Sequence, residues 1–189
     1  MKINLFFKRS VLLVIIIFGF NFVSCAKANK EVKDEKKSVQ EVSSEAPVKA
    51  TESKGPQAID FSLEMTDGKM FRLFENLDKP ILVNYWATWC PPCVREFPDL
   101  EEMYAKYKDR MNFIAVNSGE NKNTIESFMN KHKYKIPVAM DSSSSVGRMY
   151  QISGIPTTFI VATDGSMVYG HVGMMTNAQM TQAIEDALK

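Results

Sequence analysis

The sequence predicts an α/β domain with a central mixed sheet flanked by helices, and two observations carry this prediction. From about residue 81 onward, short apolar runs that favour strands alternate with stretches whose apolar residues have helical spacing. A Cys-x-x-Cys pair, Cys90 and Cys93, stands directly between one apolar run, Ile81–Trp86, and a helical pattern. With 189 residues, 45% of them hydrophobic, the chain can bury the core of one such domain.

Residues 1–25 have the pattern of an export signal. A basic start ending at Lys8-Arg9 precedes an apolar run, Val11–Phe20, that is shorter than the roughly 20 residues a membrane-spanning helix needs. The run ends in Phe22-Val23-Ser24-Cys25, which resembles a bacterial lipobox, although Phe22 replaces the usual aliphatic residue. The alternative is an uncleaved signal anchor with an incidental cysteine. We expect a lipid on Cys25, because the apolar run is short and a lone cysteine stands at its end.

Residues 26–55 are predicted to form a disordered tether between this signal and the domain. The stretch has no aromatic residue, and its seven Lys nearly balance six acidic residues. It cannot bury enough apolar area to offset the entropy of ordering. A flexible chain of about 30 residues spans on the order of 30 Å, which would keep the domain near a membrane but free to turn.

The charge of the chain argues against a nucleic-acid partner. The formal net charge is +1, and residues 56–189 carry 13 basic and 16 acidic residues, so the domain has a net charge near −3. No basic face of the kind that binds a polyanion is apparent. There is also no glycine loop that could cradle a phosphate, and we expect no cofactor and no metal.

The domain is predicted to open with a β-hairpin, because apolar residues alternate in Ala58–Leu63 and Met70–Leu73 on either side of Asp67-Gly68. The next run, Ile81–Trp86, is almost continuously apolar, which favours a strand covered on both faces. Asn84 interrupts this run, and we interpret it as a residue that satisfies buried hydrogen bonds.

A helix is predicted after Cys90, extending to about Lys108 and kinked at Pro98. Its predicted inner face consists of Val94, Phe97, Leu100, Tyr104 and Tyr107. The remaining pattern predicts strands over 111–117, 138–140, 157–162 and 167–171, the last two joined by an Asp164-Gly165 turn. It predicts helices from Asn123 to near His132, over 143–150, and after a capping box that begins at Thr176.

The cysteine pair itself favours redox chemistry. Cys90 falls where a helix should begin, and the partial positive charge of a helix N-terminus favours a thiolate, so we expect Cys90 to be the nucleophile. Pro91 suits the first helical position and Pro92 stiffens the ring. Cys93, one turn into the helix, is the expected resolving thiol.

Half of a zinc site is the alternative for such a pair, since Cys-x-x-Cys also binds structural zinc. That site needs two further ligands, and the remaining candidates, Cys25, His132 and His171, form no second pair. One cysteine for a lipid and two for redox chemistry account for all three cysteines of an exported chain.

Two motifs give a resemblance to a known family. The run Tyr85–Cys93 resembles the active-site signature of thioredoxin-like proteins, and more closely that of the membrane-tethered, extracytoplasmic TlpA/ResA thiol-disulfide oxidoreductases. Gly154-Ile155-Pro156-Thr157 matches the superfamily loop that carries a cis-proline. The resemblance covers about residues 56–189 and implies a thioredoxin fold with an N-terminal hairpin addition, a feature also found in that group.

The resemblance also assigns roles to single residues. Position alone leaves Glu96 either leaning toward the thiols or solvated on the helix, and the family's functional glutamate three residues after the second cysteine favours the first alternative. Pro156 is expected in cis beside the cysteines, with the backbone of Ile155 free to pair with an extended substrate. Trp89 either covers one side of the pair and contributes to docking or is a packed loop aromatic. Trp89, Pro91, Pro92, Ile155 and Pro156 are thus the expected substrate contacts.

The implied activity is dithiol–disulfide exchange on exported proteins that contain disulfides. Export places the chain where disulfides persist, so a reductase there needs electrons from a membrane donor, of the CcdA/DsbD type in this family. Pro91-Pro92 offers no cation to stabilise a thiolate strongly, which favours a reductase over an oxidase. Maturation of apocytochrome c is one role of the family.

Two other functions remain open from the sequence. A peroxiredoxin-type peroxidase shares the fold, but Ala87 stands where its pattern has Thr. A lipoprotein could also use a thioredoxin-like domain only to bind partners, although the presence of both Cys90 and Cys93 argues against this.

Overall fold

The computed structural model of the chain describes residues 55–189. The predicted signal segment, with Cys25, and the predicted tether as far as residue 54 lie outside the described residues. Within residues 55–189, no helix is both long enough and apolar enough to cross a bilayer.

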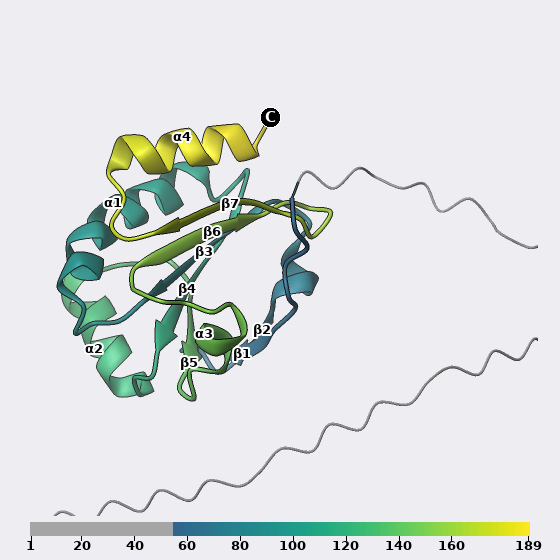
Figure 1. The fold of residues 1–189 in the computed structure, drawn as a ribbon. Coiled ribbons are helices and arrows are strands. Elements are labelled where there is room, and N and C mark those ends of the chain that lie inside the picture. Colours follow the sequence, from purple (N-terminus) through teal and green to yellow (C-terminus); the bar gives the residue numbers. More distant parts are fainter. Residues whose placement is uncertain (1–54) are drawn as a thin grey trace, which may run out of the picture. The chain divides into compact units, whose positions relative to one another are not determined.

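A five-stranded mixed sheet in the order β5-β4-β3-β6-β7 runs through the middle of the domain (Figure 1). Its strands are β3 (Ile81–Trp86), β4 (Asn112–Ser118), β5 (Val138–Asp141), β6 (Thr157–Val161) and β7 (Met167–Val172). Strands β3, β4 and β5 are parallel, whereas β6 and β7 are antiparallel to their neighbours. All six residues of β3 are buried, which confirms the prediction of a central strand covered on both faces.

Three helices and one face of the sheet enclose the larger hydrophobic core. They are α1 (Pro91–Tyr107), α2 (Lys122–His132) and α4 (Asn177–Ala187), and Figure 1 shows α4 lying across α1. The second core lies on the other face of the sheet, under α3 (Ser145–Met149) and the N-terminal segment. The predicted central mixed sheet flanked by helices is therefore confirmed.

The predicted N-terminal hairpin is also present, with shorter strands than expected. Strands β1 (Ser62–Glu64) and β2 (Met70–Arg72) pair antiparallel and lead into a 3-10 helix, Leu73–Asn76. Residues before β1 bond to other parts of the domain instead: Ala58 N–H donates to the Gly165 carbonyl, and the Tyr150 hydroxyl both accepts from Ile59 N–H and donates to its carbonyl.

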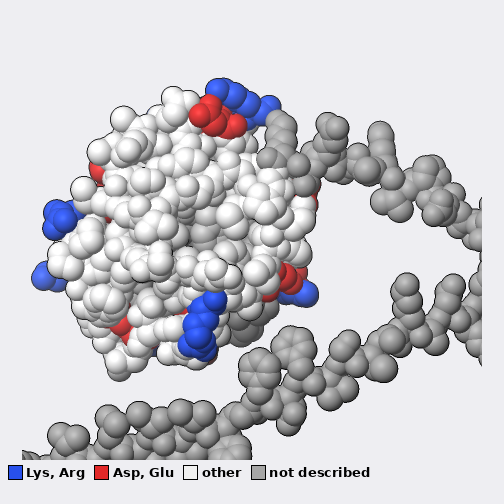
Figure 2. All heavy atoms as spheres, viewed as in Figure 1, with Lys and Arg blue, Asp and Glu red and all other residues white. Residues whose placement is uncertain are grey.

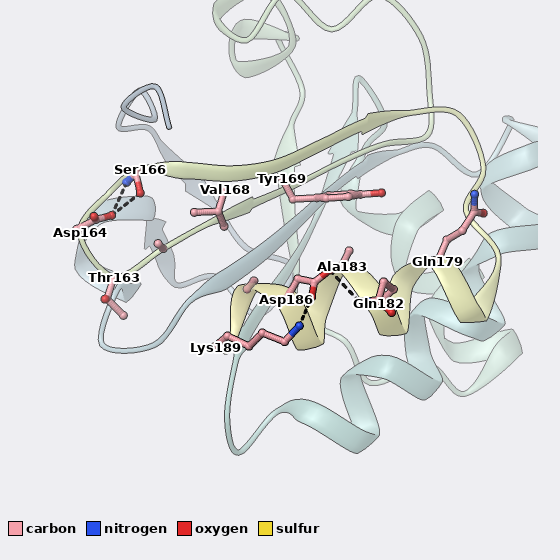
Figure 3. A pocket seen from close by; sticks show the side chains of 12 residues that line it. Thr163, Asp164, Ser166, Val168, Tyr169, Gln179, Gln182, Ala183, Asp186 and Lys189 are labelled. Carbon is pink, nitrogen blue, oxygen red and sulfur yellow. Dashed lines mark hydrogen bonds and ion pairs between the residues drawn. The ribbon is translucent and has the colours of Figure 1, made fainter. Parts of the chain in front are cut away.

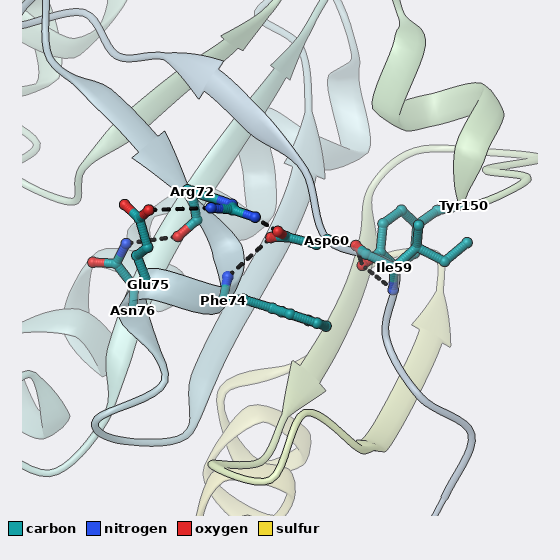
Figure 4. Close-up of polar contacts among 7 residues, drawn as sticks. All are labelled: Ile59, Asp60, Arg72, Phe74, Glu75, Asn76 and Tyr150. Atoms are coloured by element: carbon teal, nitrogen blue, oxygen red, sulfur yellow. Dashed lines mark hydrogen bonds and ion pairs between the residues drawn. The ribbon is translucent and has the colours of Figure 1, made fainter.

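Polar contacts hold this segment in place (Figure 4). One Asp60 oxygen accepts from Arg72 Nε at 2.7 Å and the other from Phe74 N–H at 3.1 Å, which ties the strand entering the hairpin to the chain leaving it. The segment therefore satisfies its backbone groups through tertiary partners, which a hairpin pattern does not predict.

The buried face of α1 differs from the predicted one. Its buried residues are Cys93, Glu96, Phe97, Leu100, Met103 and Tyr107, whereas Val94 and Tyr104 are only half-buried. The buried face of the helix therefore includes Cys93 and Glu96, and the burial of a charged residue such as Glu96 was not expected from the apolar pattern. Pro98 lies inside the helix on its exposed side.

The other helices also differ from the prediction at their ends, and α3 is shorter than the predicted helix over 143–150. The N-cap of α2 is Asn121, whose side chain accepts from Thr124 N–H, so Asn123, where a capped start was predicted, lies inside the helix. The capping box at Thr176 is confirmed, with reciprocal bonds between Thr176 and Gln179. The turn at Asp164-Gly165 between β6 and β7 is confirmed as well.

Candidate active site

Cys90 and Cys93 are joined by a disulfide at the point where β3 leads into α1, with their Cα atoms 5.3 Å apart. Cys90 is the N-cap of α1, and its Sγ accepts from the backbone N–H of Cys93 at 3.2 Å. Pro91 and Pro92 occupy the first two helical positions, where a missing N–H costs no helical hydrogen bond. The structure thus places the sulfur of Cys90 at the positive end of a helix dipole, as predicted.

Both sulfurs are shielded in this oxidised form. The exposed fraction is 3% for Cys90 and 1% for Cys93, so Cys90 is the more accessible residue by only a small margin. The order in which the two reduced thiols react stays a prediction. Trp89, by contrast, is 65% exposed, which excludes the alternative of a packed loop aromatic and leaves its ring free to meet a partner.

The second predicted landmark lies directly against Cys90. The Ile155–Pro156 peptide bond is cis, which confirms that prediction. The Ile155 carbonyl oxygen lies 3.5 Å from Cys90 Sγ, although the two residues are 65 positions apart in the chain. Beyond the proline, Gly173 N–H donates to the Pro156 carbonyl at 2.7 Å, which fixes the loop to the end of β7. Pairing of a substrate with Ile155 stays a prediction.

Glu96 is buried, with 2% of its surface exposed, so the solvated alternative is wrong. One carboxylate oxygen accepts from Asn84 Nδ2 at 2.9 Å, and the other from Met175 N–H at 2.5 Å. The amide of Asn84 also donates to Thr158 Oγ1 at 2.9 Å, which confirms its predicted role in satisfying buried hydrogen bonds. Asn84, Thr158 and Met175 therefore hold the carboxyl group of Glu96 inside the domain.

Burial raises the pKa of Glu96 to about 7, against the lowering effect of the hydrogen bonds from Met175 N–H and Asn84. A carboxyl group with this pKa can both accept and return a proton at neutral pH. Glu96 follows Cys93 by one helical turn on the buried face of α1. The structure thus places a carboxyl group that titrates near neutral pH one helical turn from Cys93, and its action as a base stays a prediction.

Glu120 is a residue of the site that the sequence pattern did not reveal. Its carboxylate accepts from Thr88 N–H and Asn117 Nδ2, each at 2.7 Å, and also from the Thr88 hydroxyl. Thr88 lies in the turn closed by Cys90 N–H and the Ala87 carbonyl, which presents Trp89 to solvent. The sequence did contain a signal for Glu120, because this acidic residue comes just after β4, a strand parallel to β3, and the ends of parallel strands meet at one edge of the sheet.

A cavity of about 770 Å³ lies away from the cysteines, between β7 and α4 (Figure 3). Its polar side chains bond mainly to one another: Asp164 accepts from Ser166, and Asp186 accepts from Gln182 and Lys189. On the face drawn in Figure 2, the charged side chains lie in small groups, mostly near the rim, and form no basic patch. The redox chemistry of the domain is therefore placed at the cysteines.

Comparisons with known proteins identify the family to which the chain is similar. The Redoxin family model matches residues 50–188. The chain is 32% identical over 181 residues to the thiol-disulfide oxidoreductase ResA of Bacillus subtilis strain 168, covering 95% of this chain and 90% of that protein.

Among solved structures, a thiol:disulfide interchange protein of the thioredoxin family from Chlorobium tepidum has a TM-score of 0.65 and 27% identity, covering 74% of this chain and 100% of that one. The exposed lipoprotein thioredoxin of Streptococcus pneumoniae strain TIGR4 has a TM-score of 0.58 and 29% identity, covering 68% of this chain and 99% of that one.

Proposed function

Because this chain belongs to the Redoxin family and is a ResA-like thiol-disulfide oxidoreductase with the thioredoxin fold, we propose that it reduces the disulfides of exported proteins while tethered to a bacterial membrane. The observation that carries this proposal is the Cys90–Cys93 disulfide at the start of α1, with the cis-Pro156 loop on one side and buried Glu96 one turn away.

The first step is an attack by the reduced protein. The Cys90 thiolate attacks one sulfur of the substrate disulfide, a mixed disulfide forms, and the second substrate sulfur leaves as a thiolate that takes a proton from water. The Cys93 N–H, which already points at Cys90 Sγ, supports the negative charge of the thiolate before the attack. Trp89, Pro91, Pro92, Ile155 and Pro156 are the residues we assign to contact with the substrate.

The second step releases the substrate. Cys93 gives its proton to the Glu96 carboxylate, and the sulfur of Cys93 attacks Cys90 Sγ. The mixed disulfide breaks, the substrate sulfur leaves as a thiolate, and the substrate has gained two electrons. The protein is left with the Cys90–Cys93 disulfide, which is the state that the structure represents.

A dithiol donor in the membrane must then return the two electrons by a second disulfide exchange. We assign this role to a donor of the CcdA/DsbD type, and apocytochrome c is the substrate that the TlpA/ResA resemblance favours. The Pro91-Pro92 pair, which lacks a cation, supports net reduction over oxidation.

The tether is the third part of the proposal. A lipid on Cys25 would hold residues 56–189 on the extracytoplasmic side of a membrane through the linker over residues 26–55. The likeness to the exposed lipoprotein thioredoxin of Streptococcus pneumoniae supports this arrangement.

A trapping experiment tests the proposal. The Cys93→Ala variant cannot resolve the mixed disulfide, so it should accumulate covalent adducts with exported proteins that dithiothreitol releases. The matched Cys90→Ala variant, which keeps Cys93, should trap few or none. Adducts formed only by the Cys90→Ala variant would reverse the assigned roles, and equal trapping by both variants would contradict the assignment of Cys90 as the attacking cysteine. Rapid turnover of hydrogen peroxide by the wild type would instead support the alternative function of a peroxiredoxin-type peroxidase.

A further inference from the structure

A second recess opens beside the cysteine pair, and we call it the α3 pocket. Its volume is about 460 Å³. Its lining includes Trp89, the residue before Cys90 in the chain, and Ile155, together with Arg148 near the end of α3 and Gln151 just after it. Because the Ile155 carbonyl lies 3.5 Å from Cys90 Sγ, a peptide bound at that sulfur reaches the pocket with a neighbouring side chain.

Hydrogen bonds to Asp141 in β5 fix the position of α3 beside this pocket. Buried Asp141 accepts from the Tyr85 hydroxyl at 2.7 Å, from Ser145 N–H at 2.8 Å and from Gly147 N–H at 3.0 Å. A Cβ at Gly147 would stand 2.6 Å from the Tyr85 hydroxyl oxygen, so α3 touches β3 as closely as a glycine allows. A wall fixed in this way does not need to be ordered when a ligand binds.

The backbone around α3 also departs from ordinary geometry at the pocket. Ser144 and Gln151 line the pocket at the two ends of α3, with φ values of 54° and 51°. Residues other than glycine rarely adopt this left-handed conformation and persist in it only where the surrounding structure imposes it.

The charge of the pocket lining is positive. Arg148 is the single charged residue among those that line the α3 pocket, and no carboxylate lines it. Its Nη1 donates to the Ser143 carbonyl at 2.8 Å, and within residues 55–189 Arg148 makes no ion pair. Ser153 adds a hydroxyl group to the same lining, and Ser118 and Ser144 add two more that interact with the Tyr85 hydroxyl. A guanidinium with neighbouring hydroxyl donors suits a carboxylate.

We propose that the α3 pocket is a specificity subsite that receives an acidic side chain beside the reactive cysteine of the substrate, and that Arg148 selects it. The inference rests on the proposed function and narrows its substrates to proteins with Asp or Glu next to the cysteine. The net charge of the domain near −3 would by itself favour a basic peptide, so a preference for acid requires this local cation.

Three disulfide-linked peptides test the proposal, identical except that both residues flanking the reactive cysteine are Glu, Gln or Lys. The measured quantity is the second-order rate constant at low salt for oxidation of the reduced full-length protein. Wild type should prefer Glu to Gln and Gln to Lys, each by roughly twofold to fivefold, as expected for one exposed ion pair. Arg148→Gln should remove the preference, Arg148→Glu should reverse it, and 0.5 M salt should shrink it, at a Debye length of roughly 4 Å.

Lys131→Gln is the matched control, since it removes one positive charge from the exposed last turn of α2 and should keep the wild-type ratio. A wild-type ratio near one, or a ratio that Arg148→Gln leaves in place, overturns the subsite. The two proposals fail differently. If none of the three peptides oxidises the protein, the proposed function fails and the subsite with it, whereas three equal rates remove the subsite alone.

Discussion

Glu96 is a carboxylic acid held almost out of contact with water, and this burial raises its pKa to about 7. The hydrogen bonds from Asn84 and Met175 N–H favour the ionised form and limit the rise. At neutral pH the group is therefore about half ionised, which suits its proposed role of taking a proton from Cys93 and later returning it.

The Glu96→Gln variant should resolve mixed disulfides more slowly, because the amide cannot accept the Cys93 proton. General-base assistance contributes roughly 10²–10⁴ in rate, and the loss should fall in that range. In the wild type, the resolution rate should rise as pH increases through about 7, where Glu96 loses its proton, and this limb should be absent in the variant. Stopped-flow measurement of resolution across pH 5–9 checks both effects. An unchanged rate and pH profile would mean that another group is the base.

The same pKa makes the stability of the oxidised protein depend on pH. Since the folded-state pKa of about 7 lies above the ordinary value of 4.5, the folded protein binds more protons between these two pH values. The free energy of unfolding should therefore fall as pH rises from 4.5 through about 7, with a contribution of about 3 kcal/mol from Glu96.

Urea unfolding at pH 5 and pH 8 tests this linkage. Wild type should lose stability relative to Glu96→Gln between the two pH values, because the variant cannot ionise. Glu64→Gln, the same substitution on an exposed side chain of β1, is the control. Parallel stability curves for wild type and Glu96→Gln would contradict the raised pKa.

Single residues of the site were predictable where a local motif fixes them. Cys90, Cys93 and the cis-Pro156 loop follow from short motifs in the sequence. The partners of Glu96 did not follow, because Thr158 is 74 positions from Asn84 and Met175 is 79 from Glu96. Only the pairing of β3 with β6 and the path of the chain into α4 bring these groups together.

At the scale of elements, α3 is a helix of five residues whose position depends on Asp141 and Tyr85 more than on its own sequence. Gly147 allows the close approach, since an added Cβ would stand 2.6 Å from the Tyr85 hydroxyl oxygen and 3.0 Å from its ring. The Tyr85 side chain is buried and bonded to Asp141, so it cannot easily move aside.

Gly147→Ala should therefore destabilise the fold, although alanine is the better helix former. The gain in helix propensity is at most about 1 kcal/mol, and the overpacking costs about 1–3 kcal/mol, so we expect a net loss of about 1 kcal/mol. Gly170→Ala in β7 is the matched control, because nothing lies within 4 Å of its added Cβ. Chemical denaturation of the two variants compares them. Equal stabilities would mean that α3 can shift away from β3 without cost.

Element types were predictable from periodicity, whereas the exact faces and ends depended on tertiary contacts. The run Ile81–Trp86 and the capping box at Thr176 formed as predicted. The predicted buried face of α1 was correct for Phe97, Leu100 and Tyr107 and wrong for Val94 and Tyr104, which are half-buried. It omitted Glu96, because periodicity treats a charged residue as solvated, whereas Asn84 and Met175 satisfy it inside the domain. The strand predicted over Ala58–Leu63 was shortened by Tyr150, which bonds the Ile59 backbone.

At the scale of the whole molecule, the site is assembled where several elements meet at one end of the sheet. The end of β3 supplies the turn before Cys90, the end of β4 supplies Asn117 and Glu120, and the start of β6 follows the cis-Pro156 loop. The α1 N-terminus lies among these loops. Because the carboxyl ends of parallel strands meet at a common edge, the sheet itself gathers the groups that serve the cysteines.

The proposed membrane tether depends on residues before the domain, and the test is whether Cys25 carries a lipid. We expect the mature protein to begin at a lipid-modified Cys25, because the apolar run Val11–Phe20 is too short to span a bilayer as a helix. Full-length protein made in a bacterium fed an alkyne-labelled fatty acid should carry the label and sediment with the membrane. Cys25→Ser should carry no label, whereas Cys90→Ser should carry as much as the wild type.

Cys25→Ser should also reduce a model disulfide in detergent at the wild-type rate, since it changes the anchor and leaves the domain over residues 56–189 intact. Mass spectrometry of the N-terminal peptide gives the decisive readout. A wild-type protein that starts at Met1 without label would establish the uncleaved anchor instead. The domain would then still face a membrane, but the third cysteine of the chain would have no role in holding it there.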